Sequence, residues 1–117
     1  MSISITVPGL QTISELNWRG HWAKRDRRRK EQQKAVYTAW RQAMFGKRAP
    51  TLPCVVRLTR FGPRLLDGDN LQASFKFCRD TVADLLKVDD GDERIQFVYD
   101  QRVDLDYSIS IQVEAQQ

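Results

Sequence analysis

The stretch LDGDNLQASFKFCRDTVADLLKVDDGDERI, residues 66–95, contains two groups of acidic residues separated by a segment with helical spacing. The first group is Asp67 and Asp69, and the second is Asp89, Asp90 and Asp92. Between the groups, an apolar side chain recurs every three or four positions: Leu71, Phe75, Cys78, Val82 and Leu85. This spacing predicts one amphipathic helix that begins at Asp69 or Asn70. Such a helix would connect two carboxylate clusters that are distant in the sequence.

The remaining segments predict four strands and one further helix. Apolar and polar residues alternate, as in half-buried strands, over residues 2–7, 54–61, 94–103 and 106–113. Residues 22–45 contain no Pro or Gly, and their apolar stripe ends just before Gly46, as in a helix with a C-terminal glycine. This order predicts an α+β fold, with a mixed four-stranded sheet and two main helices packed on it, in one domain of residues 1–117. We expect the last two strands to form a hairpin through residues 101–106.

Charge is distributed unevenly, although the chain carries a formal net charge of only +4. Residues 19–48 contain eleven Lys or Arg and two acids, whereas residues 65–106 contain five Lys or Arg and eleven acids. The first half of the long helix has no apolar face, so it either extends into solvent or lies on a negatively charged partner. If the partner is DNA, the binding side chains are Lys24, Arg25, Arg28, Arg29 and Lys30. Trp18 and Trp22 either stack on exposed bases or pack on the sheet.

The acidic residues are candidate ligands for a divalent metal ion. Asp67 and Asp69 flank a glycine, which lets the backbone turn tightly enough for both carboxylates to converge. Mg²⁺ takes oxygen ligands and would relieve the repulsion between this pair and Asp90. On one continuous helix, Lys76 and Asp80 would lie within about 20° of Asp69. The alternative roles are capping and turn formation, which are common for Asp-Gly-Asp-Asn and Asp-Asp-Gly-Asp.

Three further expectations concern single residues and the location of the protein. Phe77 lies off the apolar stripe, so it either fills a side pocket or faces a partner chain. Cys54 and Cys78 each stand in an apolar run, which is typical of buried free thiols in a reducing compartment. The sequence has no signal-peptide pattern and no apolar run of membrane-spanning length, so we expect a cytoplasmic protein without a membrane partner.

The acidic motif and the helix that follows it resemble the RusA family of Holliday-junction resolvases, in the form found in phage and prophage genes. The resemblance covers most of the chain. It is carried by Asp67-x-Asp69-Asn70-Leu71 at the start of a helix, a lysine and Asp80 on that helix, the Asp89-Asp90 pair, and a following strand at Ile95. Asn17 and the basic helix also fit this family.

The resemblance implies a homodimeric, Mg²⁺-dependent endodeoxyribonuclease that nicks four-way DNA junctions symmetrically in recombination and repair, with Mn²⁺ expected to substitute. It also implies three metal-binding aspartates and one catalytic lysine per subunit, which here are Asp67, Asp69, Asp90 and Lys76. The family lysine commonly stands where this chain has Ala73. Asp89 and Asp92 compete with Asp90 for the third acidic position. The alternative function is a non-catalytic nucleic-acid-binding protein that uses the basic helix over residues 24–34.

Overall fold

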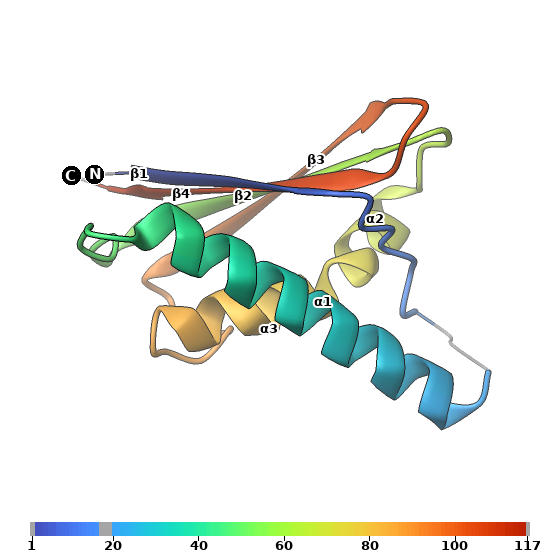
Figure 1. The fold of residues 1–117 in the computed structure, drawn as a ribbon, viewed down its shortest axis with the longest axis horizontal. Helices are drawn as coiled ribbons and strands as arrows, with labels where there is room; N and C mark the ends of the chain where they lie inside the picture. Colours follow the sequence, from blue (N-terminus) through green and yellow to red (C-terminus); the bar gives the residue numbers. More distant parts are fainter. Residues whose placement is uncertain (1, 17–19, 117) are drawn as a thin grey trace.

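A computed structural model describes residues 2–16 and 20–116, so Asn17 and Trp18 lie outside the described residues. Within these ranges the chain forms a mixed four-stranded sheet with three helices on one face (Figure 1). The strands are β1 (Ser2–Pro8), β2 (Cys54–Gly62), β3 (Ile95–Val103) and β4 (Ser108–Ala115). The helices are α1 (Trp22–Met44), α2 (Gly68–Ser74) and α3 (Lys76–Leu85). The predicted α+β class and mixed four-stranded sheet are confirmed.

The strands follow the order β1-β4-β2-β3 across the sheet. β4 is antiparallel to both of its neighbours, whereas β2 and β3 are parallel. The predicted hairpin is wrong, because β2 lies between the last two strands and the segment that connects them passes the end of β2. There, the backbone N–H of Asp104 donates to the carbonyl of Gly62 at 2.9 Å. Alternation in the sequence identifies a strand and its buried face, but it does not identify the partner strand.

The core lies between the sheet and the helices. On β1, β2 and β4, alternate residues are buried against the helices: Ile3, Ile5, Cys54, Val56, Leu58, Ile109, Ile111 and Val113. Val36 and Trp40 of α1 and Cys78 and Val82 of α3 pack against them. Both cysteines are buried free thiols, as predicted, and burial raises the pKa of Cys78 to about 12. The Cys78 thiol therefore stays protonated and acts as a small apolar side chain.

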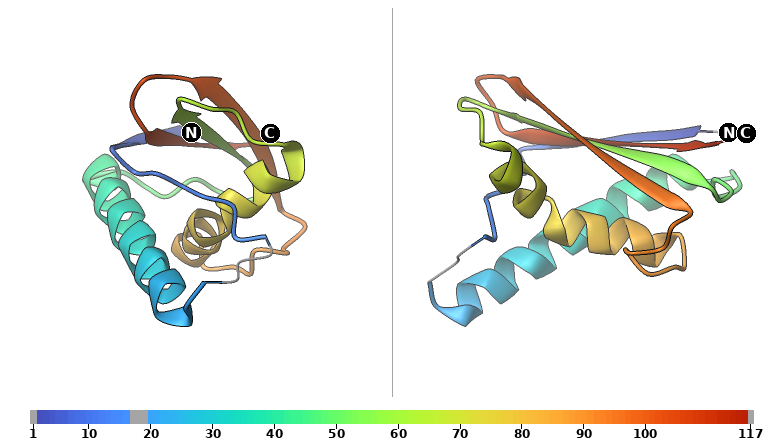
Figure 2. Two further views of the ribbon diagram at one scale, coloured as in Figure 1. Left: turned by 90° about the vertical axis from the view of Figure 1, so that its right-hand side faces the viewer. Right: turned by 180° about the vertical axis from the view of Figure 1, so that it is seen from behind.

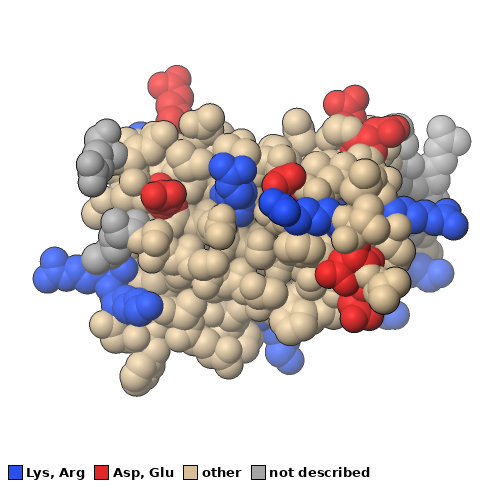
Figure 3. Space-filling view, turned by 90° about the horizontal axis from the view of Figure 1, so that it is seen from above, with Lys and Arg blue, Asp and Glu red and all other residues tan. Residues whose placement is uncertain are grey.

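The other face of the sheet carries no helix (Figure 2). Seen from that side, most of the surface is uncharged, and the charged side chains are scattered (Figure 3). On β1 and β4 the residues that alternate with the buried ones are mainly polar and neutral, including Ser4, Thr6, Ser110 and Gln112. The sheet therefore separates one apolar face from one polar face.

α1 packs on the sheet through its second half and extends beyond the sheet with its first half (Figure 2). The helix begins where Nδ1 of His21 accepts a hydrogen bond from the backbone N–H of Ala23 at 3.1 Å. It ends at Met44, and Gly46 follows with a φ of 73°, a conformation that favours glycine. α1 is rich in Arg and Lys, and none of the helices in the described ranges is long and apolar enough to cross a bilayer.

The expected single helix between the acidic groups is two helices, α2 and α3, so that prediction is wrong. α2 starts earlier than predicted, with Asp67 at its N-cap, and ends where Phe75 adopts φ −96° and ψ 8°. The hydroxyl of Ser74 donates to the carbonyl of Leu71 at 2.7 Å, a backbone contact that often bends helices. The ring of Phe75 is fully buried, 6.3 Å from the ring of Tyr99. The chain therefore turns at Phe75 so that this ring stays in the core.

Candidate phosphate-binding pocket

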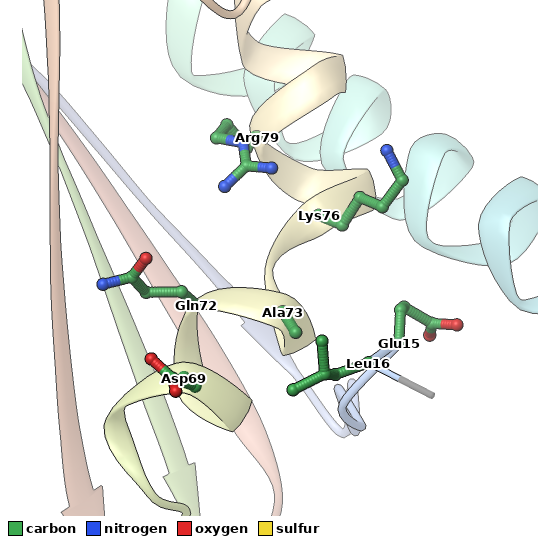
Figure 4. Close-up of a pocket in the computed structure, with 7 residues that line it drawn as sticks. All are labelled: Glu15, Leu16, Asp69, Gln72, Ala73, Lys76 and Arg79. Carbon is green, nitrogen blue, oxygen red and sulfur yellow. The ribbon is translucent and has the colours of Figure 1, made fainter. Parts of the chain in front are cut away.

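A pocket of about 420 Å³ lies where the loop after β1 meets α2 and α3 (Figure 4). Its lining residues are Glu15, Leu16, Asp69, Gln72, Ala73, Lys76 and Arg79. Two of the predicted site residues, Asp69 and Lys76, are thus brought to one pocket. Sequence reasoning missed Glu15, Gln72 and Arg79.

The loop after β1 forms one wall of the pocket because it is hydrogen-bonded to α2. The hydroxyl of Ser14 donates to Oδ1 of Asn70 at 2.7 Å, and the backbone N–H of Glu15 donates to the carbonyl of Ala73 at 3.4 Å. Asn70, part of the acidic motif, therefore helps to hold this loop in place.

Side chains from β2 and β3 hold the segment that leads into the acidic pair. Arg60 is buried and donates from Nε to the carbonyl of Thr12 at 3.2 Å and from Nη1 to the carbonyl of Arg64 at 2.9 Å. Gln101 accepts a hydrogen bond from the backbone N–H of Leu66 at 2.8 Å and donates to its carbonyl at 2.7 Å. These contacts fix the backbone immediately before Asp67, so the start of α2 is anchored to the sheet.

Lys76 lines the same pocket as Asp69 but is turned away from it. Its Nζ lies 3.5 Å from Oδ2 of Asp80, one turn further along α3. In Figure 4 the Lys76 side chain points away from Asp69. The angular relation predicted for one continuous helix does not apply, because the chain changes direction at Phe75.

Arg79 is the second cation of the pocket, and it connects the pocket to Asp90. Its Nη1 donates to the hydroxyl of Tyr99 at 2.8 Å, and its Nε lies 3.6 Å from Oδ2 of Asp90. Arg79 stands three residues after Lys76, and that spacing on a helix was the only signal for it in the sequence. Asp90 itself is not one of the lining residues, so it reaches the pocket through Arg79.

The other acids differ in their surroundings. Asp67 is exposed and makes no capping hydrogen bond to α2, so the capping role considered above does not occupy its carboxylate. Asp92 accepts hydrogen bonds from the backbone N–H of Arg94 at 2.9 Å and from its Nε at 3.0 Å. This pairing makes Asp92 a poor candidate for the third acid. Asp89 is exposed, as Asp90 is, so exposure does not distinguish these two.

Arg94 also gives a testable pH dependence. Its hydrogen bonds lower the pKa of the Asp92 carboxyl from 3.8 to about 2. A carboxyl with a lowered pKa in the folded state stabilises the fold above pH 3.8, and this contribution is lost as the pH falls through about 2. We expect Arg94→Ala to return the pKa of Asp92 toward 3.8, measured by NMR titration of the side-chain carboxyl. An unchanged pKa in this variant would contradict the assignment.

The donor set suits magnesium only in part. Within residues 2–16 and 20–116, no three His, Cys, Asp or Glu side chains are grouped so that they could hold a metal ion. Mg²⁺, however, is usually bound through one or two carboxylates and completes its shell with water and substrate phosphates. Asp67 and Asp69 are two exposed carboxylates at the start of α2, which is the number of acids that this mode of binding needs. Asp90 contacts Arg79 and is not gathered with them into a three-acid group.

The basic half of α1 is largely paired with carboxylates of its own chain. Arg28 contacts both oxygens of Glu15, at 2.9 Å and 2.7 Å, and Nε of Arg25 lies 3.3 Å from Oε1 of the same residue. Arg29 and Lys30 both pair with Asp26. Lys24 is exposed. Four of the five predicted DNA-binding side chains therefore contact an acid.

The aromatic residues near this half of α1 are placed differently from one another. Phe77 is buried beneath the guanidinium of Arg25, whose Cζ lies 5.4 Å from the ring centroid, so it fills a side pocket within the chain. Trp22 is 73% exposed and stacks on His21 with 5.6 Å between ring centroids. The packing of Trp22 on the sheet, one of the two alternatives predicted for it, is therefore wrong.

The pocket is lined by two acids, Glu15 and Asp69, and two cations, Lys76 and Arg79, on a surface open to solvent. Glu15 is paired with Arg25 and Arg28, so Asp69 is the acid of the pocket that contacts neither of them. Cations of this kind suit the oxygens of a phosphate group, and a carboxylate beside them suits a metal ion that also contacts the phosphate. No protein-family model matches the chain, and neither the curated proteins nor the solved structures gave a match.

Proposed function

We propose that this protein is a Mg²⁺-dependent endodeoxyribonuclease that resolves four-way DNA junctions by paired nicks. The observation that carries the proposal is the pocket in which Asp69 lies with Lys76 and Arg79. Asp67 is not one of the lining residues, but it is the exposed N-cap residue of α2, two positions before Asp69. The resemblance of the acidic motif to the RusA family points to the same reaction and to the same substrate.

The two aspartates and the two cations have separate roles in this proposal. Asp67 and Asp69 would hold Mg²⁺, which when bound activates water and polarises the phosphoryl oxygen. Lys76 and Arg79 would neutralise charge on the phosphate group. The lysine must leave Asp80 to do so, and their pair is a partly exposed contact at 3.5 Å, which is worth little energy.

The proposal includes a homodimer, because symmetric nicking of two strands needs two such pockets. Mass measurement in solution tests the dimer independently of cleavage. If the protein is a monomer at the concentrations used for cleavage, the proposed homodimer is wrong.

The decisive experiment compares a labelled four-way junction with a duplex of the same arm sequence. With Mg²⁺ we expect paired nicks at symmetric positions in the junction, and with EDTA we expect no cleavage. The duplex should stay intact under both conditions. Salt-sensitive binding without cutting would contradict the proposal and support the non-catalytic nucleic-acid-binding function instead.

A further inference from the structure

Arg79 is fixed at the pocket by partners on two other segments. The hydroxyl of Tyr99, on β3, accepts from its Nη1 at 2.8 Å, and Asp90, in the segment after α3, lies 3.6 Å from its Nε. The Arg79 side chain is 25% exposed, so the guanidinium is partly removed from water without being enclosed. A long side chain that is held at two of its nitrogens has already lost much of its conformational freedom.

The direction of the side chain distinguishes Arg79 from Lys76. In Figure 4 the guanidinium of Arg79 lies on the same side of the pocket as Gln72, whereas the Lys76 side chain points away from Asp69. Lys76 is also more exposed, at 42%, and its contact with Asp80 is within one helix. Arg79 is therefore the cation that contacts from other segments hold in place, and Lys76 is the more exposed one, with a contact only to its own helix.

The geometry of a guanidinium suits a phosphate that approaches through the pocket. Arginine has five N–H groups in one plane, and each can donate a charge-assisted hydrogen bond to a phosphate oxygen. The hydroxyl of Tyr99 accepts one of the five N–H groups, and Oδ2 of Asp90 lies nearest to Nε, so the partly exposed guanidinium has more N–H groups than these two contacts use. Before a ligand binds, the negative charge of Asp90 compensates the positive charge of the partly buried guanidinium.

We propose that Arg79 binds the phosphate group that is cut, and that Asp90 and Tyr99 are positioning residues that hold its guanidinium. The inference rests on the proposed function, since it assigns a residue of the same pocket. It also changes the role of Asp90, which acts on the substrate through Arg79 and does not act as a metal ligand.

The test compares Arg79→Gln with Arg57→Gln, which removes the same charge from an exposed position on β2. We expect Arg79→Gln to slow junction cleavage by about 100-fold, as for the loss of one preorganised donor to a reacting oxygen. Mn²⁺ binding to the DNA-free protein, measured by calorimetry, should stay unchanged. The variant should remain folded at the assay temperature, with a lowered thermal unfolding midpoint because the hydrogen bond to Tyr99 is lost. Arg57→Gln should cleave within about threefold of the unmodified protein, because a remote exposed charge acts only through screened electrostatics.

Asp90→Asn and Tyr99→Phe separate positioning from metal binding. Both should slow cleavage less than Arg79→Gln does, and neither should change Mn²⁺ affinity. In the Arg79→Gln background Asp90→Asn should have almost no further effect on cleavage, because residues that act as one unit are not additive. A large fall in Mn²⁺ affinity in Asp90→Asn would overturn the positioning role.

The outcomes also separate this inference from the proposed function. If the unmodified protein cuts junctions and Arg79→Gln cuts as fast as Arg57→Gln, the role of Arg79 is wrong and the proposed function stands. If the unmodified protein does not cut junctions with Mg²⁺, both proposals are wrong, because there is then no cleaved phosphate for Arg79 to bind.

Discussion

Asp69→Asn is expected to slow junction cleavage by roughly 10³-fold, because it removes a carboxylate proposed to hold the metal that activates water. Asp69 is exposed and lines the pocket, so the substitution leaves no buried group unsatisfied and the fold should persist. Junction binding in EDTA should be retained, since the neutral amide does not repel phosphate. Single-turnover cleavage with Mg²⁺ and gel-shift binding measure the two quantities separately.

Asp84→Asn is the matched control for this prediction. Asp84 is also exposed, and it lies on α3, where its carboxylate accepts a hydrogen bond from the hydroxyl of Tyr37 at 3.2 Å. It is not among the residues that line the pocket. Asp84→Asn should cleave at nearly the rate of the unmodified protein. Equal rates for Asp69→Asn and Asp84→Asn would show that the acidic motif does not bind a catalytic metal.

Glu15→Ala is expected to lower the free energy of unfolding by about 3 kcal/mol, the cost of breaking a buried ion pair by removing one partner. The Glu15 side chain is only 2% exposed, and it contacts Arg28 through both of its oxygens. The hydrogen bonds from Arg28 to Glu15 raise the pKa of the Arg28 guanidinium. Arginine also stays protonated without them, so Glu15→Ala leaves a charged, 16% exposed side chain without this carboxylate. Urea unfolding at neutral pH measures the change.

Asp26→Ala provides the comparison on the same helix. Asp26 pairs with Arg29 and Lys30, and its side chain is 33% exposed, so solvent screens the interaction. We expect a much smaller loss than in Glu15→Ala, because exposed ion pairs contribute little to stability. Similar losses in the two variants would mean that Glu15 is not the buried anchor of the basic half of α1.

Periodicity in the sequence was enough to predict the sheet and α1, because their apolar residues form regular stripes that become the core. Val36 and Trp40 on α1 are buried as the stripe indicates. The break at Phe75 could not be predicted in this way. The apolar stripe continues through it. The contacts found at the turn, from the hydroxyl of Ser74 to the backbone and from Phe75 to the distant ring of Tyr99, leave no trace in the periodicity.

The candidate site was predicted only in part, because helical periodicity was again the main evidence in the sequence. Asp69 and Lys76 line one pocket, but the count that placed them together assumed a continuous helix. Glu15 was missed because it lies in a loop without a periodic pattern, and its burial depends on Arg28. Arg79 was missed because its partners, Tyr99 and Asp90, come from other segments.

The position of β4 has a consequence for how the domain folds as it is synthesised. β4 follows every other described element in the chain, yet it lies between β1 and β2 and pairs with both. Until the ribosome has released this strand, β1 has no strand to pair with, although it is translated first. Contacts that join such distant segments form slowly, because the loop between them must close first. During synthesis, β1 therefore stays unpaired until β4 inserts between β1 and β2 and completes the sheet.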